Sequence, residues 1–86
     1  MPRISEFYGI LIYMYYGEHG APHFHAIYGE HDAVISIRGL RVLDGWLPAR
    51  ALRLVRLWAR QRREDLEMNW ALAREGRRLR PVPPLE

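Results

Sequence analysis

The sequence predicts an α+β domain in which an antiparallel β-meander of three to four strands precedes two α-helices packed on one face. Two observations carry this prediction. Residues 9–43 contain short segments rich in β-branched and aromatic residues, separated by glycine-containing turns. From Pro48 onward, the apolar residues recur at helical spacing instead. The chain has 86 residues, 49% of them hydrophobic, which suits one domain with a packed core.

The strands follow one another along the first half of the chain. Residues 9–16 form the first, and because this segment is apolar at both alternating positions, we expect both of its faces to be covered. Residues 24–28 form the second strand and residues 33–38 the third, with a tight turn between them. Residues 40–43 add a short fourth strand before an Asp-Gly turn signal. Short connections between successive strands favour antiparallel pairing.

Two helices are expected after the sheet. Pro48 suits the first turn of a helix, where its missing N–H is not needed, and Gly76 suits the end of the second. The apolar stripe changes phase near Gln61, which favours two helices over the alternative of one kinked helix. We therefore expect a single domain over residues 1–76. Residues 77–86 contain three prolines and are predicted to form an extended tail.

Alternation along the strands assigns the two faces of the sheet. One face carries the residues that we expect to pack under the helix tryptophans Trp58 and Trp70, namely Phe24, Tyr28, Ile35 and Ile37. His23, His25 and Arg38 fall on the opposite face, with Tyr13 and Tyr15 or their neighbours beside them. Because two helices cover one side of such a sheet, the opposite face is a candidate surface for a partner or a substrate.

Three of the four histidines lie within seven positions, and His23 and His25 alternate on a predicted strand. Three interpretations stay open. The imidazoles form structural hydrogen bonds, or His19, His23 and His25 bind zinc or another divalent metal, with Glu18 as an alternative third ligand. In the third interpretation, His23 and His25 act as base and acid on a phosphodiester, and Arg38 stabilises negative charge. The sequence leaves open whether the chain is an enzyme, and it predicts no cofactor beyond such a metal.

The basic residues are unevenly distributed, and all thirteen are arginine. Residues 1–37 hold four acids and one arginine, whereas residues 38–86 hold twelve arginines and six acids. Five arginines form a stripe on the first predicted helix: Arg50, Arg53, Arg56, Arg60 and Arg63. This arginine stripe either binds the phosphates of RNA or DNA or is a solvated helix face paired with acids one turn away.

A set of motifs, in order from the N-terminus to about Gly76, resembles a family of short bacterial proteins known as domain of unknown function 4160. The motifs are Pro-Arg-Ile-Ser at 2–5, Phe-Tyr-Gly-Ile at 7–10, Pro-His-Phe-His-Ala at 22–26, Leu-Pro at 47–48, Asn-Trp at 69–70 and Ala-Arg-Glu-Gly at 73–76. The resemblance implies little biochemistry. Members are often encoded beside a second small protein, in an arrangement that looks like a toxin–antitoxin pair.

These observations together lead us to expect a small cytoplasmic component of a bacterial two-gene, toxin–antitoxin-like module. It would act through protein–protein contact, as a homo-oligomer or a heterodimer with the neighbouring gene's product, and RNA cleavage or RNA binding would be its toxic activity. The alternative is a non-enzymatic module that binds nucleic acid through the arginine stripe or metal through the histidines. No membrane association is expected, because no apolar run approaches roughly 18 residues and no signal peptide is evident.

Overall fold

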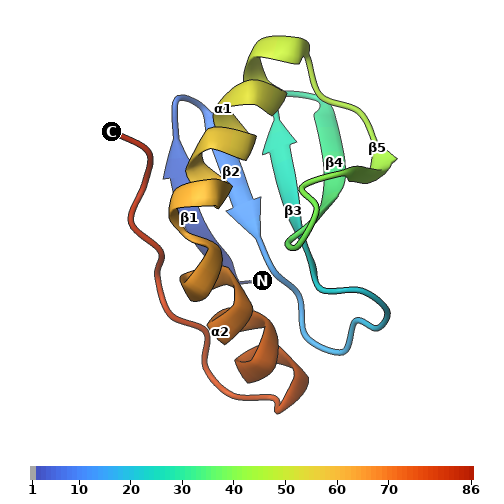
Figure 1. Cartoon of the computed structure of the whole chain (residues 1–86), viewed down its shortest axis with the longest axis vertical. Coiled ribbons are helices and arrows are strands. Elements are labelled where there is room, and N and C mark those ends of the chain that lie inside the picture. The colour runs from blue at the N-terminus through green and yellow to red at the C-terminus, as the bar shows by residue number, and fades with distance from the viewer. Residues whose placement is uncertain (1) are drawn as a thin grey trace.

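Five antiparallel strands form a meander sheet in the order β1-β2-β3-β4-β5, and two helices follow them in the chain (Figure 1). The computed structural model describes residues 2–86. The elements are β1 (Arg3–Phe7), β2 (Ile10–Tyr13), β3 (His23–Tyr28), β4 (His31–Ser36), β5 (Val42–Gly45), α1 (Ala49–Gln61) and α2 (Arg63–Arg74). The predicted α+β class, with a meander followed by two helices, is therefore confirmed.

The sheet has one strand more than the sequence predicted, because β1 precedes the first expected strand. A two-residue turn joins β1 to β2, and both of its residues have positive φ, 50° at Tyr8 and 78° at Gly9. That is the backbone pattern of a type I′ hairpin turn, which matches the natural twist of antiparallel strands. Tyr8 is an unusual residue for this position, so the turn gives only a weak signal in the sequence.

Turns also account for the shifted ends of the other strands. The turn between β3 and β4 uses only Gly29 and Glu30, so β4 begins at His31, earlier than expected. At the far end of β4, Leu40 adopts a positive φ of 54° and donates its N–H to the Ser36 carbonyl. Residues 37–41 therefore form a turn, and β5 covers residues 42–45 in place of the predicted 40–43.

The core lies between one face of the sheet and α1 (Figure 1). Trp58 is fully buried there, with its ring centroid 5.1 Å from that of Phe7 and 5.8 Å from that of Phe24. One expectation for this face was wrong, because Tyr28, the last residue of β3, is 38% exposed. Trp70 is buried in the same core cluster as Phe24 and Ile35, as expected, and it also packs against His23, with 4.9 Å between ring centroids. Trp70 reaches His23 because α2 runs on beyond the ends of the strands (Figure 1).

The break between the helices falls at Arg62, where the change of phase predicted it. The end of α2 is also as predicted. Gly76 has a φ of 70°, its N–H bonds to the Ala73 carbonyl, and the next N–H, of Arg77, bonds to Leu72. This is the Schellman pattern, in which glycine supplies the left-handed residue that closes a helix. Within residues 2–86, neither helix is both long and apolar enough to cross a membrane.

Residues 77–86 form an extended tail that packs back along the domain (Figure 1). Val82 and Leu85 are buried in the main core cluster. The Val82 N–H donates to the Ile4 carbonyl of β1 over 2.7 Å, and Trp58 Nε1 donates to the Pro83 carbonyl over 2.8 Å. The tail thus covers the outer edge of β1, which would otherwise present unpaired backbone groups.

Candidate metal centre

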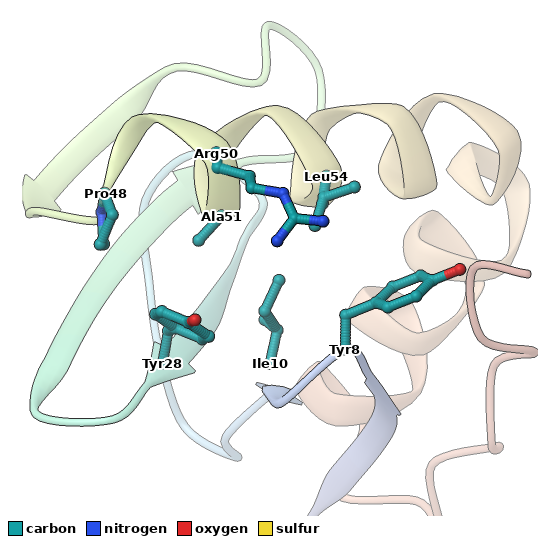
Figure 2. A pocket seen from close by; sticks show the side chains of 7 residues that line it. All are labelled: Tyr8, Ile10, Tyr28, Pro48, Arg50, Ala51 and Leu54. Atoms are coloured by element: carbon teal, nitrogen blue, oxygen red, sulfur yellow. The ribbon is translucent and has the colours of Figure 1, made fainter.

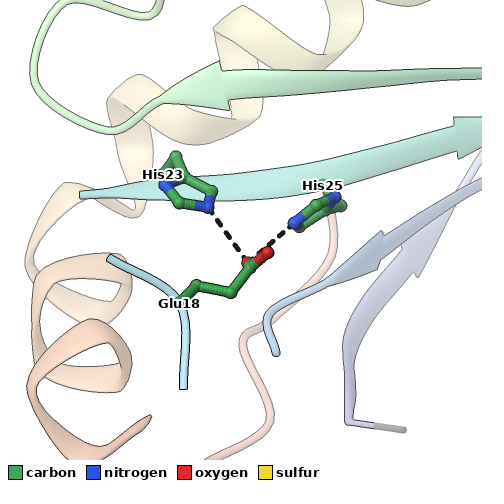
Figure 3. Close-up of side chains that lie close together, drawn as sticks. All are labelled: Glu18, His23 and His25. Carbon is green, nitrogen blue, oxygen red and sulfur yellow. Dashed lines mark hydrogen bonds and ion pairs between the residues drawn. The ribbon is translucent and has the colours of Figure 1, made fainter. Parts of the chain in front are cut away.

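Three side chains with metal-binding atoms converge at the start of β3, namely those of Glu18, His23 and His25 (Figure 3). Glu18 Oε1 lies 3.0 Å from His23 Nε2 and 2.8 Å from His25 Nε2. One ligand atom from each residue falls within 4.8 Å of the other two. Among residues 2–86, this is the one group of three or more such side chains that could share a metal ion.

The β2–β3 loop and the alternation of β3 create this arrangement. His23 and His25 lie two positions apart on β3, so their side chains leave the same face of the sheet. Glu18 belongs to the loop, which turns back toward β3 through Gly17 and Gly20, with φ angles of 77° and 90°. Positive φ is readily adopted only by glycine, so these two residues allow the loop to place the carboxylate between the imidazoles.

Aromatic rings hold both imidazoles in place. Trp70 of α2 packs on His23, and Tyr15 packs edge-on against His25 with 4.5 Å between ring centroids. The side chains of His23 and His25 are 11% and 21% exposed, and that of Glu18 is 31% exposed. The cluster is therefore largely shielded from water but opens to solvent on the Glu18 side.

Two groups at this site, the Glu18 carboxyl and the neighbouring Tyr15 phenol, have shifted pKa values. Burial raises the pKa of the Glu18 carboxyl, but the hydrogen bonds and positive charge of His25, and then of His23, outweigh burial and hold this pKa below its ordinary value. Burial also raises the pKa of the Tyr15 phenol, and the charges of Tyr13, Glu18 and Asp32 raise it further. The site is thus an anionic carboxylate next to a neutral phenol.

The hydrogen bonds of His23 define which of its nitrogens faces the cluster. His23 Nδ1 lies 2.9 Å from the Ala21 carbonyl oxygen. A carbonyl oxygen can only accept, so Nδ1 carries a proton and donates it. Nε2 is the atom that points at Glu18 (Figure 3). The backbone thereby fixes both the orientation of the ring and the nitrogen available for a ligand bond.

Of the residues named from the sequence as metal ligands, the structure brings His23 and His25 together and leaves His19 out. His19 is exposed on the loop, and Glu18, the alternative third ligand, takes the central place. Arg38 lies beyond the end of β4, in the turn that follows it. Its guanidinium Nε is 3.4 Å from Glu67 of α2, so this arginine pairs with a helix and not with the carboxylate of the cluster.

Four members of the arginine stripe lie on α1, but the fifth, Arg63, is the first residue of α2, because the helix breaks at Arg62. Two of the five bind backbone carbonyls. Arg56 Nε donates to the Leu40 carbonyl over 2.9 Å, and Arg63 donates to the Arg38 carbonyl over 2.8 Å. The other three members, Arg50, Arg53 and Arg60, are exposed. The first turn of α1 contains no acidic residue. Arg56 thus fastens α1, and Arg63 fastens the start of α2, to the β4–β5 connection, and the other three arginines are exposed to solvent.

The sheet face away from α1, here called the outer face, is defined by the strand register. Its central side chains are half-buried and apolar or aromatic: Leu11, Tyr13, Ile27 and Val34, next to His25. Cross-strand neighbours of these residues bring exposed carboxylates to the rim. Glu6 pairs with Leu11, Asp32 with Ile27, and Asp44 with Val34. The outer face therefore has an apolar centre with acids around it.

A small pocket lies at the opposite end of the sheet from the histidines, below the start of α1 (Figure 2). Its volume is about 70 Å³. Tyr8, Ile10 and Tyr28 line the pocket from the side of the sheet, and Pro48, Arg50, Ala51 and Leu54 line it from the start of α1. No pattern in the sequence predicts this pocket, because its walls come from a turn, two strand ends and a helix that are distant in the chain.

Comparison with known proteins adds one match. A family model described as a domain of unknown function (DUF4160) matches residues 9–71, which include β2 to β5, the histidine cluster and α1. No curated protein and no solved structure matches the chain.

Proposed function

The chain belongs to the family known as domain of unknown function 4160, and on that premise we propose that it is a cytoplasmic component of a two-gene, toxin–antitoxin-like module. It acts by binding the product of the neighbouring gene through its outer face. The observation that carries the proposal is the half-exposed apolar centre of that face. Exposed apolar patches with a polar rim are typical of protein–protein contact sites.

The charge of the outer face indicates what the partner looks like. Glu6, Asp32 and Asp44 stand around the apolar centre, and Arg3 at its edge is already paired with Glu6 at 3.2 Å. A complementary partner presents apolar side chains surrounded by basic residues. Opposite charges across an interface accelerate association and exclude wrong partners. Binding should therefore slow as salt rises.

The test is a binding measurement with the purified neighbouring gene product. Ile27→Lys puts a charged side chain in the centre of the outer face, opposite Asp32, where it can pair without disturbing the sheet. We expect affinity to fall by at least about tenfold, because central contact residues dominate interface energetics. Leu57→Lys, at an exposed position of α1, is the matched control and should bind normally. Equal affinity of the two variants would exclude the outer face as the contact.

Light scattering over a wide range of dilution distinguishes the two forms of assembly. A heterodimer leaves the isolated chain monomeric, whereas a homo-oligomer through the same face dissociates in Ile27→Lys alone. Induced expression, with and without the neighbouring gene, then tests the module itself. Growth arrest that is relieved by expression of the neighbouring gene supports the interpretation that the chain is a toxin. If the neighbouring gene no longer relieves the arrest caused by Ile27→Lys, the neutralising contact involves the outer face.

We propose RNA binding along α1 as a second candidate, because Arg50, Arg53 and Arg60 are exposed and the first turn of the helix lacks acids. Fluorescence anisotropy with a labelled single-stranded RNA tests it. Replacing the three arginines with glutamine should abolish binding, whose affinity in the unmodified chain should fall steeply with salt. RNA integrity followed during expression reports cleavage, and His25→Ala would remove cleavage if the imidazoles act as acid and base.

A further inference from the structure

We propose that Glu18, His23 and His25 form a binding site for a divalent first-row cation, with Zn²⁺ as the best match. Two imidazoles and one carboxylate are a ligand set that zinc accepts, and catalytic zinc sites commonly use three protein ligands of these types. The site borders the outer face at His25, which pairs with Tyr13 and Val34, but its test measures metal binding directly and needs neither the partner nor an activity.

The spacing of the ligand atoms suits a shared ion after a small adjustment. Ligands at the ordinary zinc distances of about 2.0–2.1 Å in a tetrahedron stand roughly 3.3 Å from one another. Glu18 Oε1 is 3.0 Å and 2.8 Å from the two Nε2 atoms. An ion among the three atoms requires these two gaps to widen by a few tenths of an ångström, and the two imidazole nitrogens, which lie within 4.8 Å of each other, to stand at about the same separation. Glu18 can supply the first movement, because it sits on a loop and its side chain is partly exposed.

The second argument is the pair of acceptors around His23. Its Nδ1–H is given to the Ala21 carbonyl, while Nε2 points at a carboxylate oxygen. Both ring nitrogens of His23 therefore face acceptor oxygens, which has two explanations. Either the ring is an imidazolium that donates from both nitrogens, or it is neutral and a cation lies between its Nε2 and the carboxylate. Metal-binding histidines in proteins characteristically donate their other N–H to a carbonyl or carboxylate, and Ala21 provides that partner here.

Three protein ligands leave a fourth position on a tetrahedral ion. The cluster is closed on one side by Trp70 and on another by Tyr15, and it opens to solvent where Glu18 is exposed. The fourth ligand therefore comes from the open side, as a water or a side chain of another molecule. This arrangement resembles open zinc sites more than closed structural ones.

The test uses the full chain, stripped of metal with chelator and titrated with ZnCl₂ in a calorimeter. We expect one equivalent of zinc to bind, and the melting temperature to rise by roughly 10 °C when free zinc is about a hundred times its Kd. Histidine-selective ¹⁵N NMR should show the Nε2 signals of His23 and His25 shifting on zinc addition, while His23 Nδ1 keeps its proton. The proposal would be overturned if the titration released no heat of binding and zinc left the melting temperature unchanged.

Three variants assign the ligands. Glu18→Gln keeps the shape of the side chain and its hydrogen-bonding capacity but removes the charge, so it should fold and lower zinc affinity at least about tenfold. His25→Ala should do the same, and far-UV circular dichroism checks its fold. His19→Ala is the matched control, because His19 is exposed on the same loop and outside the cluster. Zinc binding that survives Glu18→Gln and His25→Ala but disappears in His19→Ala would contradict this site.

Discussion

Trp58 joins three parts of the molecule through one side chain. Its ring packs between Phe7 of β1 and Phe24 of β3, and its indole N–H donates to the Pro83 carbonyl of the tail. A large aromatic ring contributes much buried apolar area, and its polar atom needs a partner when it is buried. Trp58 satisfies both requirements, so it links the sheet, α1 and the tail.

Trp58→Ala should therefore lower the free energy of unfolding by about 3–5 kcal/mol, as for other large truncations in packed cores. His25→Ala should cost much less in metal-free protein, because His25 is part-exposed and faces away from that core. Urea denaturation of both variants measures the difference. Equal losses would mean that the histidine belongs to the structural core and that its surface role is wrong.

The hairpin between β4 and β5 depends on a glycine that no other residue can replace without a clash. Gly45 pairs with Ala33 across the two strands, and a Cβ at this position would overlap the Asp32 carbonyl oxygen. Its φ of 77° adds backbone strain for any side chain. Gly17 has the same φ of 77°, but no atom lies within 4 Å of the place where its Cβ would be.

This pair separates steric overlap from backbone strain. Gly17→Ala should cost about 1 kcal/mol, the lower end for a strained residue, whereas Gly45→Ala should cost at least about 1–2 kcal/mol more and loosen β5. Thermal melts report stability, and amide hydrogen exchange reports the pairing of β5 with β4. If the two variants have the same melting temperature, β5 accommodates the added methyl group by moving.

Asn69 is the contact by which α2 holds the tail. It is almost fully buried, its Nδ2 donates to the Arg80 carbonyl over 2.8 Å, and its Oδ1 accepts the Arg80 N–H at 2.9 Å. A side-chain amide thus replaces a strand partner for one residue of the tail. Both of its polar atoms are satisfied, which a buried amide requires.

Asn69→Asp should destabilise the protein by about 1–3 kcal/mol, because the carboxylate cannot donate and faces the Arg80 carbonyl. Met68→Ala, at an exposed neighbouring position on α2, should change stability by no more than about 0.5 kcal/mol. Chemical denaturation compares them. A harmless Asn69→Asp would show that the tail detaches at little cost.

At the scale of the elements, the sequence predicts most clearly what local pattern determines. The change of phase near Arg62 correctly predicted the break between the two helices, and Gly76 correctly predicted the end of the second. Alternation along β3 correctly placed Phe24 and His25 on opposite faces of the sheet. The pairing of Asn69 with Arg80 and the packing of Trp70 on His23 join segments far apart in the chain. No periodicity encodes such contacts. For the same reason the sequence left Glu18 and His19 as rival third ligands.

At the scale of the whole molecule, the C-terminal tail, residues 77–86, completes the hydrophobic core. Val82 and Leu85 are buried with side chains from both ends of the domain, and the tail supplies partners for Trp58 and Asn69. Burying a valine and a leucine stabilises a fold by about 1.5–3 kcal/mol each. Domains of this size are stable by only about 5–15 kcal/mol in total, so the tail accounts for a large part of the stability.

Removing residues 79–86 should lower the free energy of unfolding by about 3–6 kcal/mol, from the burial of those two side chains alone. Removing Glu86 alone, which is exposed, is the matched control and should have little effect. Calorimetry of the two shortened chains checks the prediction. A truncated chain that melts like the control would show that the sheet and α1 are sufficient by themselves.

The contact between Val82 and Ile4 has a consequence for how the protein is made. Translation releases the chain from its N-terminus, so β1 leaves the ribosome long before the residues that complete its outer edge. Because domains generally fold as units, the sheet and both helices can pack together once they have emerged. Until residues 82–85 emerge, however, the edge of β1 is open and Trp58 lacks its carbonyl partner. A nascent chain that pauses before that point exposes the unpaired edge of β1 to other nascent chains on the same mRNA.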